Sequence, residues 1–138
     1  MSWLAYALIS AAAAALTAIL AKIGIEGVPS ALATAIRTLA VVVCAWTVVI
    51  GLDQHRALST ISARSVIFLA LSGVATAVSW LAYFHALQMA PASWVAPIDK
   101  LSLPFTIVLA ALLLREAVTW QVVAGVTLMV IGALITRA

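Results

Sequence analysis

Long apolar runs alternate with short polar connections along this 138-residue chain. A bilayer core about 30 Å thick requires roughly 20 apolar residues in a helix that rises about 1.5 Å per residue. Five runs approach this length, and glycine, proline and aspartate residues that favour turns lie between them. The pattern predicts five membrane-spanning helices, over residues 3–21, 31–52, 66–89, 93–114 and 118–136.

The composition places this chain in a bilayer. Hydrophobic residues make up 67% of the sequence and charged residues 8%, with a mean hydropathy of +1.27, which leaves too little polar surface to coat a soluble globule. The longest connection, residues 53–65, is expected to hold a turn of interfacial helix. We predict an all-α membrane protein with a single transmembrane domain over residues 1–138, surrounded by lipid.

The net charge of +3 comes from scattered groups, and no basic, aromatic-rich patch is present that would hold nucleic acid. Five spans place the termini on opposite sides of the membrane, here side A for the N-terminus and side B for the C-terminus. Arg56, Arg64 and Arg115 fall on side A, and Lys22 and Arg137 lie near side B. These charges slightly favour a cytoplasmic side A, but the bias is small enough to allow insertion in both orientations.

Polar side chains of several predicted helices converge at one level near side B. Arg37 lies about six residues, or roughly 9 Å, inside the second helix, and Asp99 and Lys100 lie at a similar depth in the fourth. The excess of positive charge at this level favours a ligand that carries carboxylate or phosphate. The predicted substrate-binding residues are Arg37, Ser79, Trp80, Tyr83, Asp99 and Lys100.

Asp99 and Lys100 are adjacent ionisable residues in an apolar stretch, where charge is costly to bury. Neighbouring residues point about 100° apart around a helix axis, so we expect Asp99 to contact Arg37 rather than Lys100. Pro97 and Pro104 lack the N–H groups that would bond the carbonyls of residues 93 and 100, which predicts a broken helix with free backbone acceptors. Burial favours the protonated carboxyl, so Asp99 is also the predicted proton-coupling residue.

Each of these residues also has a purely structural interpretation. Lys22 and Lys100 can stretch to the side B surface, and an Arg37–Asp99 salt bridge can simply hold two helices together. Ser72 and Thr76, on the same helix face as Ser79 and Tyr83, can bond neighbouring helices or their own backbone. Gly125 and Gly132 share a face of the last helix and predict close helix packing.

Catalytic and metal-binding patterns do not stand out in the sequence. Cys44, His55 and His85 have no metal-ligand spacing, and there is no glycine-rich phosphate loop, serine elbow or carboxylate pair. The sequence therefore predicts neither an enzyme nor a cofactor-binding protein.

Several motifs together resemble the EamA domain of the drug/metabolite transporter superfamily. Lys22-Ile23-Gly24 and Arg37 are similar to the first two helices of that domain. Arg115 stands where the family usually has glycine, and Asp99-Lys100 is similar to short single-domain members. The other motifs that carry the resemblance are Trp80 to Leu87, Ala90 to Pro97, Pro104, Leu114-Arg115-Glu116, and Gly125 with Gly132.

The resemblance implies half of a ten-helix inverted-repeat transporter fold, since family members usually contain two such domains. Two copies would then associate as an antiparallel homodimer with dual topology, in line with the weak charge bias. We predict a multi-pass transporter of the cell inner membrane that exports or exchanges a small anionic or zwitterionic metabolite, by proton antiport. The alternatives are a flippase for an anionic lipid carrier and a non-transporting structural membrane subunit.

Overall fold

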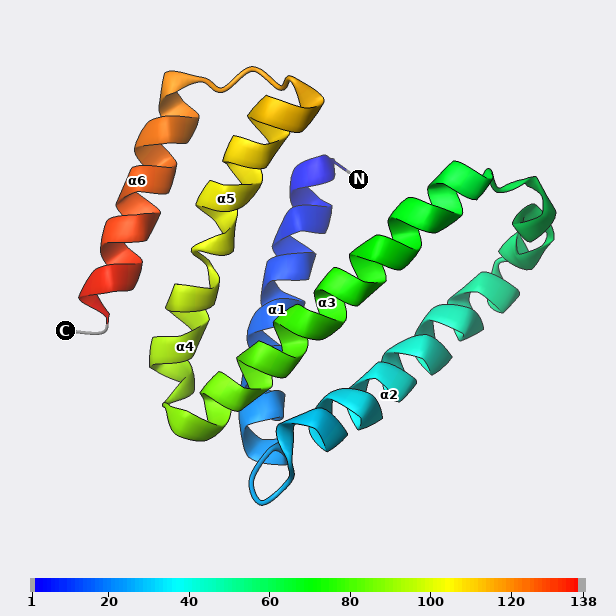
Figure 1. The fold of residues 1–138 in the computed structure, drawn as a ribbon, viewed down its shortest axis with the longest axis horizontal. Helices are drawn as coiled ribbons and strands as arrows, with labels where there is room; N and C mark the ends of the chain where they lie inside the picture. The colour runs from blue at the N-terminus through cyan, green and yellow to red at the C-terminus, as the bar shows by residue number, and fades with distance from the viewer. Residues whose placement is uncertain (1, 137–138) are drawn as a thin grey trace. The chain divides into compact units, whose positions relative to one another are not determined.

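The computed structural model describes residues 2–136, which form helices and no strand. This confirms the all-α prediction. The elements (Figure 1) are α1 (Trp3–Gly24), α2 (Ser30–Gly51), the 3₁₀ helix η1 (Gln54–Thr60), α3 (Ala63–Met89), α4 (Ala92–Asp99), α5 (Ser102–Leu109), the π-helical turn η2 (Ala110–Leu114) and α6 (Trp120–Ile135).

Within residues 2–136, four helical segments are long and apolar enough to cross a membrane: α1, α2, α3 and the stretch Ala92–Leu114. The fifth apolar helix, α6, has 16 residues, which corresponds to about 24 Å. It begins at Trp120 rather than Val118 because Thr119 is its N-cap, with a hydroxyl that accepts a hydrogen bond of 3.5 Å from the Val122 amide. The fifth span, and with it the five-helix count, stays a prediction.

The first three helices match the predicted ranges to within three residues at each end. The expected turn of helix between the second and third spans is present as η1. Asp53, the residue directly before η1, adopts the left-handed conformation (φ 55°). Aspartate tolerates this conformation better than most residues.

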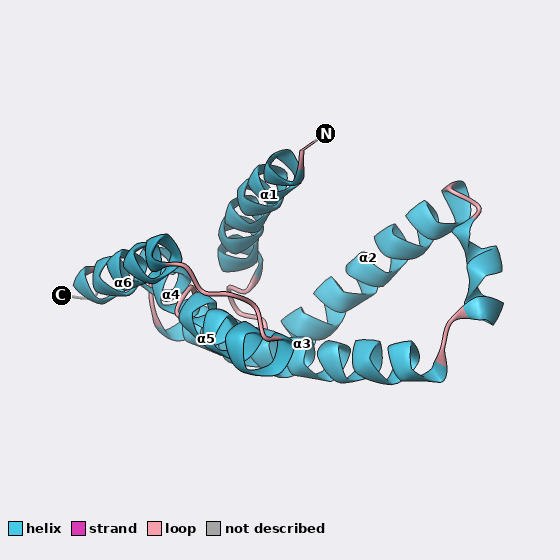
Figure 2. Ribbon diagram, turned by 90° about the horizontal axis from the view of Figure 1, so that it is seen from above, coloured by secondary structure: helices cyan, strands magenta, loops and turns pink. Residues whose placement is uncertain are grey.

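The structure divides into two compact units, residues 1–19 with 89–138 (unit 1) and residues 20–88 (unit 2). In unit 2, α2 and α3 run in opposite directions and are joined through η1 (Figures 1 and 2). The buried side chains of this unit belong to the connection before α2, the second turn of α2 and the last two turns of α3. They are Ile25, Thr34, Phe84 and Leu87.

Unit 1 contains α4, α5, η2 and α6, with contacts from both α4 and α5 to α6. Among its described residues only Ala133 is buried. The many exposed apolar side chains of both units are compatible with a bilayer, where lipid tails surround a helix and apolar surface has little drive to leave them.

Arg115 ends η2 in the left-handed conformation, with φ 56°. This conformation is easy for glycine and strained by roughly 1–2 kcal/mol for a residue with a Cβ. The strain gives a physical reason why the resemblance leads one to expect glycine at this position.

Candidate functional site

The Arg37 side chain of α2 lies against two aromatic rings of α3. Its guanidinium carbon is 4.0 Å from the centroid of the Trp80 ring and 5.6 Å from that of Phe84. Residues 80 and 84 are four apart and therefore share a helix face. A guanidinium over such rings gains from their negative faces, and more so away from water. The rings thus hold a cation inside a membrane-length helix pair.

Tyr83 extends this aromatic cluster. Its ring meets that of Phe84 edge to face, with centroids 6.4 Å apart and planes at 79°. The structure therefore brings together three of the predicted residues, Arg37, Trp80 and Tyr83, while Ser79 lies exposed on the same helix. Phe84 was not predicted as a site residue, although its spacing of four from Trp80 was a sufficient signal.

No carboxylate of unit 2 neutralises Arg37. Within residues 20–88, all of which are described, ion pairs involve Asp53 with His55 at 3.5 Å and with Arg56 at 2.9 Å, and none includes Arg37. A guanidinium that stacks by its face still presents N–H groups along its edge. That edge matches the two oxygens of a carboxylate or phosphate.

Asp99 and Lys100 are close to each other, which corrects the prediction that they make a poor direct pair. Lys100 Nζ is 3.5 Å from Asp99 Oδ2. The angular argument fails because α4 ends at Asp99, and the chain turns through Lys100 and Leu101 instead of continuing as a helix. Both side chains are partly exposed, 37% for Asp99 and 55% for Lys100.

The predicted break in the fourth span is confirmed, since α5 begins anew at Ser102. The expectation of a free carbonyl at Lys100 is wrong. Its oxygen accepts a 3.0 Å hydrogen bond from the Leu103 amide, because the backbone tightens into a turn that substitutes the amide three residues on for the one that Pro104 lacks. The feature that remains at the break is therefore the charged pair of Asp99 and Lys100, and not a free carbonyl at Lys100.

Arg37 belongs to unit 2, and Asp99 with Lys100 to unit 1. The Arg37–Asp99 contact and the shared level near side B therefore stay predictions.

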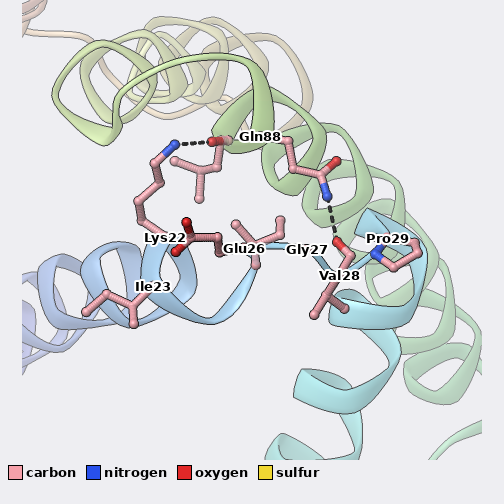
Figure 3. Close-up of a pocket in the computed structure, with 9 residues that line it drawn as sticks. Lys22, Ile23, Glu26, Gly27, Val28, Pro29 and Gln88 are labelled. Carbon is pink, nitrogen blue, oxygen red and sulfur yellow. Dashed lines mark hydrogen bonds between the residues drawn. The ribbon is translucent and has the colours of Figure 1, made fainter.

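Two side chains tie the connection between α1 and α2 to the end of α3 (Figure 3). The Lys22 ammonium donates a hydrogen bond to the Leu87 carbonyl, and the Gln88 amide donates one of 2.7 Å to the Val28 carbonyl. The last carbonyls of a helix have no intrahelical partner, and a cation at that end is favoured by the helix dipole. Lys22 thus caps α3 from another segment of the chain.

The other residues singled out in the sequence either form hydrogen bonds within their own helix or have open space beside them. The Thr76 hydroxyl donates a hydrogen bond of 2.9 Å to the Ser72 carbonyl, one turn earlier in α3. Among the described residues, no atom other than the neighbouring residues and the nearby backbone of α6 lies within 4 Å of where a Cβ would stand on Gly125 or Gly132, so close packing on these glycines stays a prediction. In residues 2–136, no three His, Cys, Asp or Glu side chains are grouped to hold a metal ion.

Comparison with known protein families matches residues 1–138 to the EamA-like transporter family. The chain belongs to this family. A relative from Sinorhizobium sp., named "Uncharacterized transporter in cobO 3'region", is 43% identical over 134 residues, which cover 97% of this chain and 95% of the relative. No solved structure matches.

Membership of the EamA-like family makes this chain a multi-pass membrane transporter protein, and indicates a transporter rather than an enzyme. It also confirms the resemblance found in the sequence. The family match does not single out residues, so the roles of Arg37 and Asp99 rest on the geometry above.

Proposed function

We propose that this EamA-family protein exports or exchanges a small metabolite bearing a carboxylate or phosphate, and that Arg37 recognises this group. The observation that supports the proposal is a guanidinium stacked 4.0 Å over Trp80, in a unit where no carboxylate pairs with it. A cation that pairs with no carboxylate of its own unit is costly at membrane depth. Binding an anion is a function that accounts for that cost.

The aromatic cluster prepares Arg37 for this role. Trp80 and Phe84 restrict the long side chain to one orientation, so less conformational entropy is lost when a ligand binds. Tyr83 adds a phenolic hydroxyl beside the cluster, and Ser79 adds a second hydroxyl on the same helix. The arrangement suits a molecule with an anionic group and an apolar body.

Asp99 is the proposed coupling residue. It stands at the α4–α5 break beside Lys100, where an exchange of proton and substrate would alter the charge of one short segment. We further propose that two copies assemble as an antiparallel homodimer with dual topology in the inner membrane, which would complete a ten-helix inverted repeat. The weak charge bias of the sequence supports this assembly.

A structural role for Arg37 is the competing proposal, and one observation favours it: the same stacking joins α2 to α3. A helix-joining arginine should affect stability when replaced, whereas a recognition residue should affect ligand binding in a protein that still folds.

The first experiment is a thermal-shift screen of the purified protein against carboxylates, phosphates, amino acids and cationic drugs. We expect stabilisation by a molecule with an anionic group, and uptake of that molecule by proteoliposomes. Stabilisation by cations alone would contradict the proposal. Arg64, which lies over Phe68 at 5.9 Å, provides the matched control for Arg37.

The dimer has its own test. Single cysteines introduced into the two ends of the chain, in a Cys44→Ala background, should be labelled from both sides of the membrane in intact cells. Labelling of each position from one side only would defeat the antiparallel arrangement.

A further inference from the structure

A hollow of about 750 Å³ lies between the α1–α2 connection and the end of α3, within unit 2 (Figure 3). Its volume falls in the range of small-molecule sites. Apolar side chains line part of it, and three polar side chains enter from different directions. The lining is Lys22, Ile23, Ile25, Glu26, Gly27, Val28, Pro29, Leu87 and Gln88.

The walls of this hollow are fixed by specific local structure. Lys22 is held by the Leu87 carbonyl and the connection is held by the bond from Gln88 to Val28. Gly27 adopts φ 73°, a turn conformation that a side chain would strain. The hollow is therefore built by three independent features rather than left by loose packing.

Opposite charges stand on the same wall. Lys22 lies in the last turn of α1, and the exposed Glu26 follows four residues later in the connection. Figure 3 draws both side chains at the hollow. The Leu87 carbonyl is neutral, so this hydrogen bond positions the ammonium and does not itself cancel the charge. The pair can receive a phosphate at Lys22 and an ammonium group at Glu26.

The position of the hollow indicates that the phosphate and the ammonium group belong to a lipid. It lies where α1 and α3 end and α2 begins, and all three are membrane-length apolar helices. Such ends lie at the level of the phospholipid headgroups. Ile23 lines the hollow and is 68% exposed, so apolar surface for acyl chains continues from it along α1.

We propose that this hollow binds the headgroup of a phospholipid that carries both a phosphate and a primary ammonium, as phosphatidylethanolamine does. The phosphate lies against Lys22 and the ammonium donates to Glu26. This site is separate from Arg37, and its failure would leave the proposed transport function untouched. It accounts for a carboxylate and an ammonium on one wall, which a purely anionic lipid would not need.

The test measures lipid binding to the purified full-length protein by native mass spectrometry. The probes are dioleoyl phosphatidylethanolamine, phosphatidylcholine and phosphatidylglycerol, together with soluble phosphoethanolamine. Phosphatidylcholine has no N–H to donate to Glu26, and phosphatidylglycerol has no ammonium. We expect phosphatidylethanolamine to bind about tenfold more tightly than either, the lower end of what a charge-assisted hydrogen bond contributes.

Glu26 variants give the deciding result. Replacing Lys22 also removes its hydrogen bond to the Leu87 carbonyl and so can affect folding, whereas replacing Glu26 leaves that bond in place. Glu26→Gln should reduce the affinity for phosphatidylethanolamine to that for phosphatidylcholine, and Glu26→Lys should shift the preference to phosphatidylglycerol. The matched control Glu116→Gln should keep the wild-type order. Lys22→Gln should weaken both phosphatidylethanolamine and phosphatidylglycerol.

Equal binding of the three lipids to the wild-type protein would overturn the proposal, as would an unchanged preference in Glu26→Gln. Binding of soluble phosphoethanolamine without a lipid preference would assign the hollow to a water-soluble ligand and so overturn the lipid as its source.

Discussion

Units 1 and 2 each place a basic residue in a membrane-length segment, and they accommodate it differently. In unit 2, Arg37 sits in an unbroken α2 and stacks on rings of the next helix. In unit 1, Lys100 sits at the point where the helix stops, 3.5 Å from Asp99. One cation is held by aromatic faces and the other by an adjacent carboxylate.

The difference has a chemical consequence. Aromatic rings stabilise a cation without removing its charge, so Arg37 remains able to attract an anion. The Asp99–Lys100 pair is neutral as a whole, and it changes its charge when the carboxyl takes up a proton. We therefore propose anion recognition for unit 2 and proton exchange for unit 1.

The largest expected effect is that of Arg37→Ala on transport. We expect the rate in proteoliposomes to fall about 100-fold, which corresponds to the loss of a charge-assisted hydrogen bond of about 2.7 kcal/mol. Arg64→Ala removes another arginine that lies near a ring, that of Phe68 on its own helix, and should change the rate less than twofold. A similar loss in both variants would show that the effect is not specific to Arg37.

Phe84→Ala should have the next largest effect, on folding stability. Phe84 is 3% exposed and Phe68 is 62% exposed. We expect Phe84→Ala to lower the free energy of unfolding in detergent by about 2 kcal/mol, through the cavity and the lost ring contacts, and Phe68→Ala to lower it by less than about 0.5 kcal/mol. Equal effects would mean that the aromatic cluster does not support unit 2.

Asp99→Asn addresses unit 1. The variant keeps the shape of the side chain but cannot exchange a proton, so transport driven by a pH gradient should fall about tenfold, to the rate without a gradient. The free energy of unfolding of the variant, measured in detergent alongside, distinguishes a loss of coupling from a loss of folding. Retention of the gradient dependence would remove Asp99 from coupling.

Arg115→Gly should have the smallest effect, and in the opposite direction. Relief of the strained left-handed conformation exceeds the greater chain entropy of glycine, so we expect about 0.5–1 kcal/mol of added stability. Thermal unfolding of both proteins in the same detergent measures this. A loss of stability would indicate that the Arg115 side chain makes a stabilising contact.

The sequence predicted the helices well because apolar runs of membrane length leave few alternatives. It predicted the break in the fourth span from Pro97 and Pro104, but not how the break resolves, since the hydrogen bond from Leu103 to the Lys100 carbonyl depends on local backbone geometry. The later start of α6 depends on one capping hydroxyl, at Thr119.

The candidate site was predicted only in part. Depth counting selected both Arg37 and Trp80, which the structure brings into contact, but it considered only charged groups as partners for a charge. It did not consider the ring faces of Trp80 and Phe84 as partners for Arg37, and the predicted Arg37–Asp99 contact stays a prediction. The hydrogen bonds that Lys22 and Gln88 donate join residues 60 or more positions apart, which sequence spacing does not reveal.

The claim that Arg37 recognises an anionic group is tested most directly by the dissociation constant of the strongest carboxylate or phosphate ligand from the screen, measured for Arg37→Lys and Arg64→Lys. Lysine keeps the charge but loses the planar edge and the stacking. We predict that both variants fold with unfolding temperatures close to wild type, and that Arg37→Lys alone binds the ligand at least about tenfold more weakly. An unchanged dissociation constant in a folded Arg37→Lys protein would contradict the account.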